Sequence, residues 1–522
     1  MATVIGFDFG THQTKVCIAN NDDPRNVTYD FLEFTDPISG KKGFVLPSLV
    51  QINTDKTISY GFANRDNCLS LSNPRLAPKP FQEIPMPKEI QTLPPEPQEP
   101  AGYTRAEVVQ RINEVNSQRK KQKGKKGIPL TEEKIAEATR ILDKKRMAAY
   151  KTAHREWEQS CLQIKQKYEK ECRDVIQQNK WREEIYEREL SESQRMKPQY
   201  YQNFKFTTFT GSDTRNFLTG NQLSLLYITY ILFLLEERYG QDFSIQFGVP
   251  ASPNTYKQQR TLATRLILRA YKLVENVFEN DIDKFLASDY ETLVALSELP
   301  EFSEEIKDEY GIIILPEASA CLKALADAGK LTENKLHLMM DIGGGTTDIS
   351  FFGVVNHSPK IYWFKSIPYG LNFTRENPKN VQKYREEIRK TVDQLQKELF
   401  RDFAETGMPK KYMDDGIDGD ILVYNGGGSS ENGLCQAYGY FKTVRRIRDI
   451  LPIRFKEDDV TKLCHILSNS YGLSNQVGDE ESSIKLHPFE DILKVYKQQV
   501  RAAKIQNTSQ KNEYEHGLSD LN

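Results

Sequence analysis

The chain has 522 residues, of which 38% are hydrophobic and 28% are charged, and its formal net charge is −2. This composition is typical of a globular protein with more than one domain and some long polar helices. The small net charge predicts no general attraction to nucleic acids or anionic membranes, and the longest apolar run, at 223–235, is shorter than the about 20 residues of a bilayer span.

The N-terminal sequence and the cysteines favour the cytoplasm. MATVIGFDFG lacks the basic and apolar regions that are typical of a signal peptide. Seven cysteines are scattered along the chain without a CxxC pair, a usage typical of thiols in a reducing compartment. We therefore expect a cytoplasmic protein that does not contact a membrane.

The first two hundred residues change composition twice. Residues 1–75 alternate short apolar runs with turn residues, which predicts several strands. The proline-rich segment 74–100 predicts an extended linker. Residues 104–195 are rich in Glu, Lys, Arg and Gln and are interrupted at 123–129, which predicts two antiparallel helices, the second capped by Thr131.

The second predicted helix has an apolar stripe at alternating four- and three-residue steps, the spacing of a coiled-coil seam. The stripe consists of Trp157, Cys161, Ile164, Tyr168, Cys172 and Val175. We expect a coiled-coil hairpin over 104–195 that binds a protein partner, and the alternative is one long helix packed on its own protein. The basic run at 119–126 is interpreted as a solvated loop, with a phosphate-binding tip as the alternative.

Globular patterns return after residue 200. The pattern predicts helices at about 219–239, 256–274, 316–328 and 378–405, strands at 243–252 and 311–315, and a polar C-terminal tail.

Two glycine turns far apart in the chain share one pattern. VIGFDFGTHQTKVCIA at 4–19 and HLMMDIGGGTTDISFFGV at 337–354 each place Asp-apolar-Gly between two apolar strands. Asp8 aligns with Asp341, and Gly10 aligns with Gly343. Two such turns predict two similar lobes that face each other.

The chemistry of these turns suits a phosphate ligand. Glycine exposes backbone N–H groups to phosphate oxygens, and one aspartate per turn suits Mg²⁺, which is held by few carboxylates together with phosphates and water. A third glycine turn at 426–429 opens a predicted helix and is interpreted as the nucleoside side of the site. The threonines that add hydroxyl donors are Thr11, Thr14, Thr346 and Thr347.

In this order, the three turns resemble the phosphate 1, phosphate 2 and adenosine motifs of the actin-like ATPase superfamily. The sequence is most similar to the nucleotide-binding domain of DnaK-type 70-kDa heat-shock proteins, over about 1–80 and 205–475. Further similar segments are LPSLV at 46–50, YGFAN at 60–64, FGVPAS at 247–252 and LPEASACLKAL at 315–325.

The resemblance implies an α/β fold with two duplicated ribonuclease-H-like lobes and ATP or ADP with Mg²⁺ as ligands, and the inserted helical coiled-coil hairpin departs from the family. It implies lobe I from 1–80 and 205–333, the insertion at 81–204, lobe II at 334–470, and a closing segment with a tail at 471–522. The family's peptide-binding domain is not expected in this chain.

Individual roles also follow from the resemblance. Asp8 and Asp341 would approach Mg²⁺, Glu317 would position or deprotonate the attacking water, and Lys79 is the candidate for the family's catalytic lysine. The family order is Glu-Pro, whereas this chain reads Pro316-Glu317. The expected phosphate-binding residues are Gly10, Thr11, Thr14, Gly343, Gly344, Gly345, Thr346, Thr347 and Asp348. The expected adenosine contacts are Glu387, Lys390, Gly427, Gly428 and Ser429.

These inferences predict a slow ATPase, or an ATP sensor, that acts as a nucleotide-dependent switch or assembly factor for a protein partner. The alternative is an actin-like protein that self-associates into filaments with ATP, and a third interpretation is a small-molecule kinase. Nucleic acid is not an expected partner.

Overall fold

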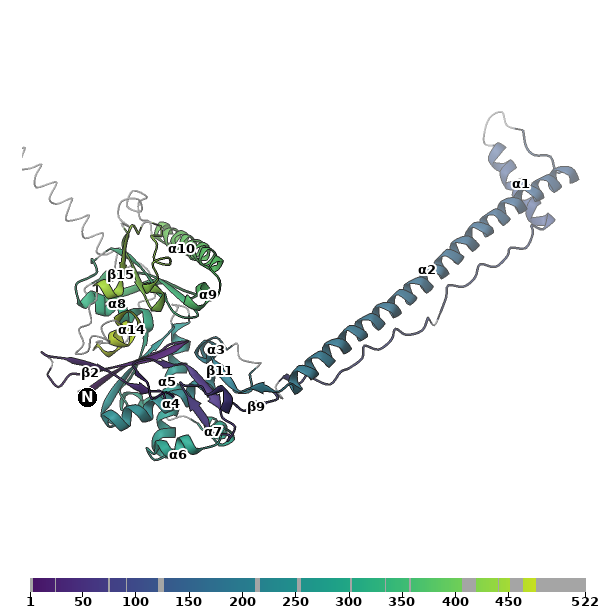
Figure 1. Cartoon of the computed structure of the whole chain (residues 1–522). Helices are drawn as coiled ribbons and strands as arrows, with labels where there is room; N and C mark the ends of the chain where they lie inside the picture. The colour runs from purple at the N-terminus through teal and green to yellow at the C-terminus, as the bar shows by residue number, and fades with distance from the viewer. Residues whose placement is uncertain are drawn as a thin grey trace, which may run out of the picture. The chain divides into compact units, whose positions relative to one another are not determined.

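The computed structural model describes residues 3–23, 25–73, 76–90, 92–120, 126–211, 216–250, 255–300, 303–333, 335–355, 358–405, 419–439, 441–450 and 463–475. The chain divides into two compact units (Figure 1). Unit 1 consists of Met1–Arg75 and Met196–Asn522, and unit 2 consists of Leu76–Arg195. Unit 2 is therefore an insertion, and its bounds lie within about ten residues of the expected 81–204.

Unit 1 contains a first mixed sheet with the strand order β13-β12-β1-β2-β3. β1 and β2 form an antiparallel hairpin that β3 extends, while β12 and β13 add to β1 in parallel. The strands are β1 (Thr3–Phe9), β2 (Gln13–Asn20), β3 (Thr28–Phe31), β12 (Phe243–Val249) and β13 (Ile312–Pro316), and β6 (Leu46–Pro47) pairs with β2 off this path.

A second sheet in unit 1 repeats this arrangement, with the order β16-β15-β14-β17-β18. β14, β15 and β16 are antiparallel, and β17 and β18 add to β14 in parallel. The strands are β14 (Leu336–Ile342), β15 (Thr347–Val355), β16 (Ser358–Ile367), β17 (Gly419–Asn425) and β18 (Thr443–Arg446). The two sheets therefore share strand order and pairing sense, and the α/β class is confirmed.

Four long helices of unit 1 lie where the apolar periodicity predicts them, whereas the helix at 464–474 was not predicted. α4 (Gly220–Tyr239) contains the longest apolar run and begins with a capping box between Thr219 and Gln222. The other long helices of unit 1 are α5 (Tyr256–Lys272), α8 (Glu317–Asp327), α10 (Lys379–Glu405) and α14 (Cys464–Ser474). Among the described residues, no helix is both long and apolar enough to cross a bilayer.

α14 contacts elements of both halves of unit 1. It packs on β1 and β2 of the first sheet and on α8. A Cβ atom on Gly6 of β1 would clash with the Ser470 carbonyl, so glycine permits this close approach. The predicted boundary at residue 471 falls inside this helix, and residues 476–522 of the expected tail lie outside the described residues.

Shorter elements complete unit 1. The short strands are β4 (Phe34–Thr35), β5 (Lys42–Gly43), β7 (Leu49–Ile52), β8 (Ile58–Tyr60), β9 (Ser70–Leu71), β10 (Lys197–Pro198) and β11 (Tyr200–Gln202). The short helices are η1 (Arg65–Asn67), α3 (Phe204–Thr210), η3 (Leu273–Val277), α6 (Ile282–Ala287), α7 (Tyr290–Ser297), η4 (Glu304–Asp308), α9 (Leu371–Glu376), η5 (Gly427–Ser430) and α12 (Ile447–Ile450).

Unit 2 contains the two predicted helices, but they do not form a long hairpin. α2 (Glu132–Gln194) has 63 residues and begins at the predicted cap, since the Thr131 side chain accepts a hydrogen bond from the Lys134 backbone. α1 (Arg105–Lys120) is much shorter and packs only near the start of α2, where Val108 and Ile112 contact Ile135. The coiled-coil hairpin expected over 104–195 is therefore not confirmed, because α1 packs at the start of α2 and not on the predicted seam.

An extended chain covers the rest of the seam instead. From Phe81 onward, the half-buried residues of the proline-rich segment recur at steps of three with a single step of four, close to the three-residue period of a polyproline II helix. They are Phe81, Ile84, Pro87, Ile90, Pro94, Pro97 and Pro100. Trp157, Cys161, Ile164, Tyr168, Cys172 and Val175, the predicted seam, are half-buried on α2. Figure 1 shows the extended segment running alongside α2.

Two hydrogen-bonded anchors fit this pairing of an extended chain with a helix. Trp157 Nε1 donates to the Pro94 carbonyl (2.8 Å), and the Asn179 side chain bonds both the N–H (2.8 Å) and the C=O (2.9 Å) of Ile84. From Ile84 to Pro94 a polyproline helix advances about 31 Å, and from Asn179 to Trp157 an α-helix spans about 33 Å. The two anchors therefore fit one antiparallel pairing of the extended segment with α2.

Candidate functional site

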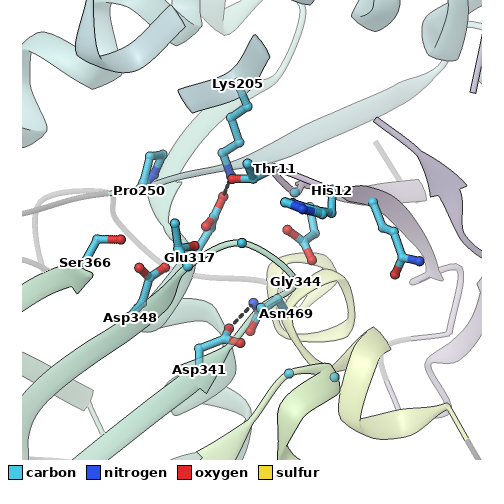
Figure 2. A pocket seen from close by; sticks show the side chains of 18 of the residues that line it. Thr11, His12, Lys205, Pro250, Glu317, Asp341, Gly344, Asp348, Ser366 and Asn469 are labelled. Carbon is cyan, nitrogen blue, oxygen red and sulfur yellow. Dashed lines mark hydrogen bonds and ion pairs between the residues drawn. The ribbon is translucent and has the colours of Figure 1, made fainter. Parts of the chain in front are cut away.

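A cavity of about 670 Å³ lies within unit 1, and residues from both Asp-apolar-Gly turns line it (Figure 2). Its volume is in the range of small-molecule sites. Eleven of the predicted residues line this cavity: Asp8, Gly10, Thr11, Glu317, Asp341, Gly343, Gly344, Gly345, Thr346, Asp348 and Gly427.

In the first turn, a lysine faces the predicted aspartate. Asp8 and Lys15 are cross-strand partners in the β1–β2 hairpin, and Lys15 Nζ lies 2.8 Å from Asp8 Oδ2. Burial alone would lower the pKa of Lys15, but the charge of Asp8 and this hydrogen bond outweigh it and raise the pKa. Lys15 is therefore held as an ammonium group in the cavity.

In the second turn, the same pair of positions holds two aspartates. Asp341 and Asp348 are cross-strand partners in the β14–β15 hairpin. Asp341 Oδ2 accepts hydrogen bonds from Asn425 Nδ2 (3.1 Å) and Asn469 Nδ2 (2.8 Å). These bonds orient the Asp341 carboxylate within the cavity.

Burial raises the pKa of both aspartates in the second turn. The pKa of Asp348 is raised to about 7 by burial, and its Oδ1 has no hydrogen-bond partner among the described residues. The pKa of Asp341 is also raised by burial, although the bonds from Asn469 and Asn425 oppose the shift. Both shifts mean that burial disfavours the ionised form of each carboxyl group, and that the surrounding protein groups only partly offset this effect.

The imidazole ring of His12, which belongs to the first turn, lies against Gly344 and Gly345 of the second turn. A Cβ atom on Gly344 would lie 2.9 Å from His12 Cδ2, and one on Gly345 would lie 2.5 Å from His12 Cε1. Only glycine lets the ring approach this closely. Burial lowers the pKa of His12, and its Nδ1 has no partner among the described residues.

Glu317 is the first residue of α8, and its side chain enters the cavity (Figure 2). Lys205 Nζ of α3 forms an ion pair with Glu317 Oε1, and the two side chains are only 4% and 14% exposed. Burial raises the pKa of Glu317, and the charge of Lys205 opposes this shift. The Pro316-Glu317 order therefore still places a carboxylate in the site, because Pro316 ends β13 and caps α8.

The third glycine turn lines the cavity with Gly426, Gly427 and Ser430. Gly428 and Ser429 were expected at the ligand, but both are buried behind the turn. A Cβ atom on Gly428 would clash with Ile342, and Ser429 Oγ donates to the Gly426 carbonyl (2.7 Å). The turn forms the single 3-10 turn η5, and the expectation that it opens a longer helix is wrong.

Two predicted threonines serve the structure behind the turns and are not among the lining residues. Thr14 is fully buried, with its hydroxyl 3.2 Å from Ser48 Oγ. Thr347 is fully buried, and its hydroxyl donates to the Tyr369 carbonyl (2.8 Å). Both hold the hairpins in place because their hydroxyl groups are used within the protein.

Three further predicted residues do not line the cavity. Glu387 and Lys390 pair with each other on α10 at 2.8 Å. Lys79 is exposed and belongs to unit 2. The lysines near the carboxylates in the structure are Lys15 and Lys205, which the sequence analysis missed.

Lys15 and Lys205 were both missed for identifiable reasons. Lys15 follows Asp8 by seven positions, as Asp348 follows Asp341, so comparison of the two turns would have pointed to it. Lys205 comes after the whole of unit 2, and its proximity to Glu317 depends on the tertiary fold.

The charged side chains of the cavity are suited to an anionic ligand that binds as a complex with a cation. Four carboxylates, those of Asp8, Glu317, Asp341 and Asp348, lie with the ammonium groups of Lys15 and Lys205, while the other two cations that line the cavity bind residues elsewhere: Lys365 bonds Gln394, and Arg375 pairs with Glu431. A free triphosphate would meet excess negative charge, whereas a magnesium complex would not. Within the described residues, no group of three His, Cys, Asp or Glu side chains is placed to hold a metal directly.

Comparison with protein-family models and with curated protein sequences found no match to this chain.

Proposed function

We propose that unit 1 is an actin-like ATPase of the DnaK type, which binds Mg-ATP in the cavity and hydrolyses it slowly. The observation that carries the proposal is the meeting of two topologically equivalent Asp-apolar-Gly hairpins around one cavity that also holds the Lys205–Glu317 pair. The matching strand orders of the two sheets support duplicated ribonuclease-H-like lobes.

Different residues of the chain would have different roles in phosphoryl transfer. Backbone N–H groups of the two turns are suited to bind phosphate oxygens, and Mg²⁺, when bound beside Asp8 and Asp341, supplies charge neutralisation to the phosphates. Lys15 and Lys205 add positive charge at the carboxylates. Glu317, held by Lys205, orients a water molecule for in-line attack and accepts its proton.

Hydrolysis of ATP would switch the protein between two states that differ in how they act on a protein partner. The segment from β10 to α3 follows directly after α2 in the chain and carries Lys205. Nucleotide contacts at Lys205 would therefore act on one of the two segments through which unit 2 joins unit 1. We infer a nucleotide-dependent switch or assembly factor in the cytoplasm, with unit 2 as the part that contacts the partner.

Phosphate release and ATP affinity of the purified chain test the proposal. Unaltered protein should release phosphate slowly with Mg-ATP, and Glu317→Gln should bind ATP but lose about 100-fold in turnover. Lys390→Ala, outside the cavity, serves as the control and should leave both unchanged. Absence of ATP binding by the unaltered protein would overturn the proposal.

A filament-forming actin-like protein is the second candidate, supported by the same duplicated sheets. Light scattering with Mg-ATP separates the two functions. Growth to large particles, reversed after hydrolysis, would favour the filament, whereas a discrete species at all times would favour the switch.

A further inference from the structure

The net charge of −2 conceals an uneven distribution of charge within unit 2. Residues 105–155, here called the basic segment, contain 15 Lys and Arg but only six Asp and Glu. Residues 156–195, here called the neutral segment, contain eight Lys and Arg and ten Asp and Glu. The positive charge of unit 2 is therefore concentrated on α1, on the connection to α2 and on the first part of α2.

Four basic residues of α2 share one face of the helix. Arg140, Lys144, Lys151 and Arg155 follow each other at steps of four, seven and four, which places them within a sector of about 60°. All four are exposed. Along the axis they span about 22 Å.

Among the described residues, these four side chains take part in none of the ion pairs found in unit 2. Neighbouring carboxylates are engaged elsewhere: Glu137 pairs with Lys134, and Asp143 accepts a hydrogen bond from the Tyr103 backbone. Like charges four residues apart on a helix are mutually destabilising. The stripe therefore carries a cost for folding that an anionic partner would remove.

The basic segment lacks the apolar face that a membrane-surface helix needs. Its buried apolar side chains, Val108, Ile112 and Ile135, face inward between α1 and α2. The large exposed apolar residues of this segment are Leu130 and Ile141, which do not form a continuous face. A row of unpaired cations on a polar helix instead fits the regularly spaced phosphates of a nucleic acid.

We propose that the first part of α2 binds the phosphate backbone of duplex nucleic acid without sequence preference, through Arg140, Lys144, Lys151 and Arg155. This inference goes beyond the proposed ATPase and does not depend on it. It replaces the expectation, based on the overall net charge, that nucleic acid is not a partner. Affinities of backbone-only binding lie at about 1–100 µM at physiological salt.

The test is fluorescence anisotropy of a labelled random-sequence DNA duplex titrated with the full chain at several salt concentrations. A variant with Arg140, Lys144, Lys151 and Arg155 all changed to Gln should bind at least tenfold more weakly. The slope of log K against log salt should fall by about 3.6, because each lost phosphate contact removes about 0.9. Circular dichroism verifies that α2 is intact in the variant.

The matched control changes Lys165, Lys167, Lys170 and Arg173 of the neutral segment to Gln. It removes the same charge from the same helix, and it should retain affinity and slope. Equal weakening by both variants, or no binding by the unaltered chain, would overturn the proposal. Binding of vesicles of phosphatidylserine and phosphatidylcholine without binding of duplex would overturn it in favour of a membrane. The Glu317→Gln variant should bind the duplex as the unaltered chain does. A failure of the ATPase proposal can therefore be distinguished from a failure of the nucleic-acid proposal.

Discussion

Lys205 of α3 and Glu317 of α8 form a buried ion pair in the cavity of unit 1, although 112 positions separate them in the chain. Each stands at the junction of elements: α3 follows β11, and α8 follows β13 directly. Burial of such a pair is unfavourable unless both charges are used or fully bonded. We interpret the pair as a catalytic arrangement that ATP and water complete.

Lys205→Ala should therefore lower ATP hydrolysis much more than ATP affinity. Loss of the ammonium group leaves Glu317 without the cation that orients it, and we expect turnover to fall by about 100-fold. Phosphate release under saturating Mg-ATP measures this effect, and equilibrium ATP binding serves as the second readout. Lys79→Ala is the matched lysine control and should behave like the unaltered protein. The opposite result would restore Lys79 as the catalytic lysine.

Asp348 should make the stability of unit 1 depend on pH. Its folded pKa is raised to about 7, above the usual value of 3.8, so the folded state binds more protons than the unfolded state between these values. Stability contributed by this group is therefore present at low pH and is lost as the pH rises through about 7. Asp348→Asn should raise the melting temperature at pH 8 by about 2 °C or more and have less effect at pH 5.

Thermal unfolding without nucleotide, followed between pH 5 and pH 8, checks this expectation. Asp393→Asn on the exposed face of α10 is the control, because it also removes one carboxylate. Equal stabilisation at both pH values by Asp348→Asn would contradict the assigned pKa shift.

His12 and Gly345 should be coupled energetically. Gly345→Ala would place a methyl group against the His12 ring, because the Cβ position lies 2.5 Å from Cε1. The two turns would be pushed apart, and we expect ATP affinity to fall about tenfold, which corresponds to about 1.4 kcal/mol. His12→Ala in the same chain should recover most of this loss, since it removes the obstructing ring.

A double-mutant cycle of ATP affinities measures the coupling. Additive effects of the two substitutions would show that Gly345 is needed for its backbone, by the ligand or the turn, and not for the approach of the imidazole.

Patterns of residues that are close in the sequence predicted the aspartates of the site, but they could not predict a lysine that only the tertiary fold brings to it. Asp8 and Asp341 were identified because the residues that form each turn are consecutive in the sequence. Lys205 was missed because unit 2 separates it from the first strands, and Lys79 was chosen only for its position in the chain. The six seam residues of α2 were identified correctly as a stripe, yet their period is the same whether a second helix or an extended chain covers them.

Asn179 should hold the extended segment of unit 2 against α2. Its amide donates to the Ile84 carbonyl at 2.9 Å and accepts from the Ile84 N–H at 2.8 Å. Asn179→Ala removes both bonds and leaves two backbone groups without partners, a local cost of about 1–3 kcal/mol. Hydrogen exchange at Ile84 should therefore become at least fivefold faster, while Trp157 keeps its bond to Pro94 and exchange along α2 changes little. Gln178→Ala, at an exposed neighbouring position, should leave the exchange at Ile84 unchanged. Faster exchange along the whole of α2 in Asn179→Ala would instead mean that the helix depends on the extended segment for its own stability.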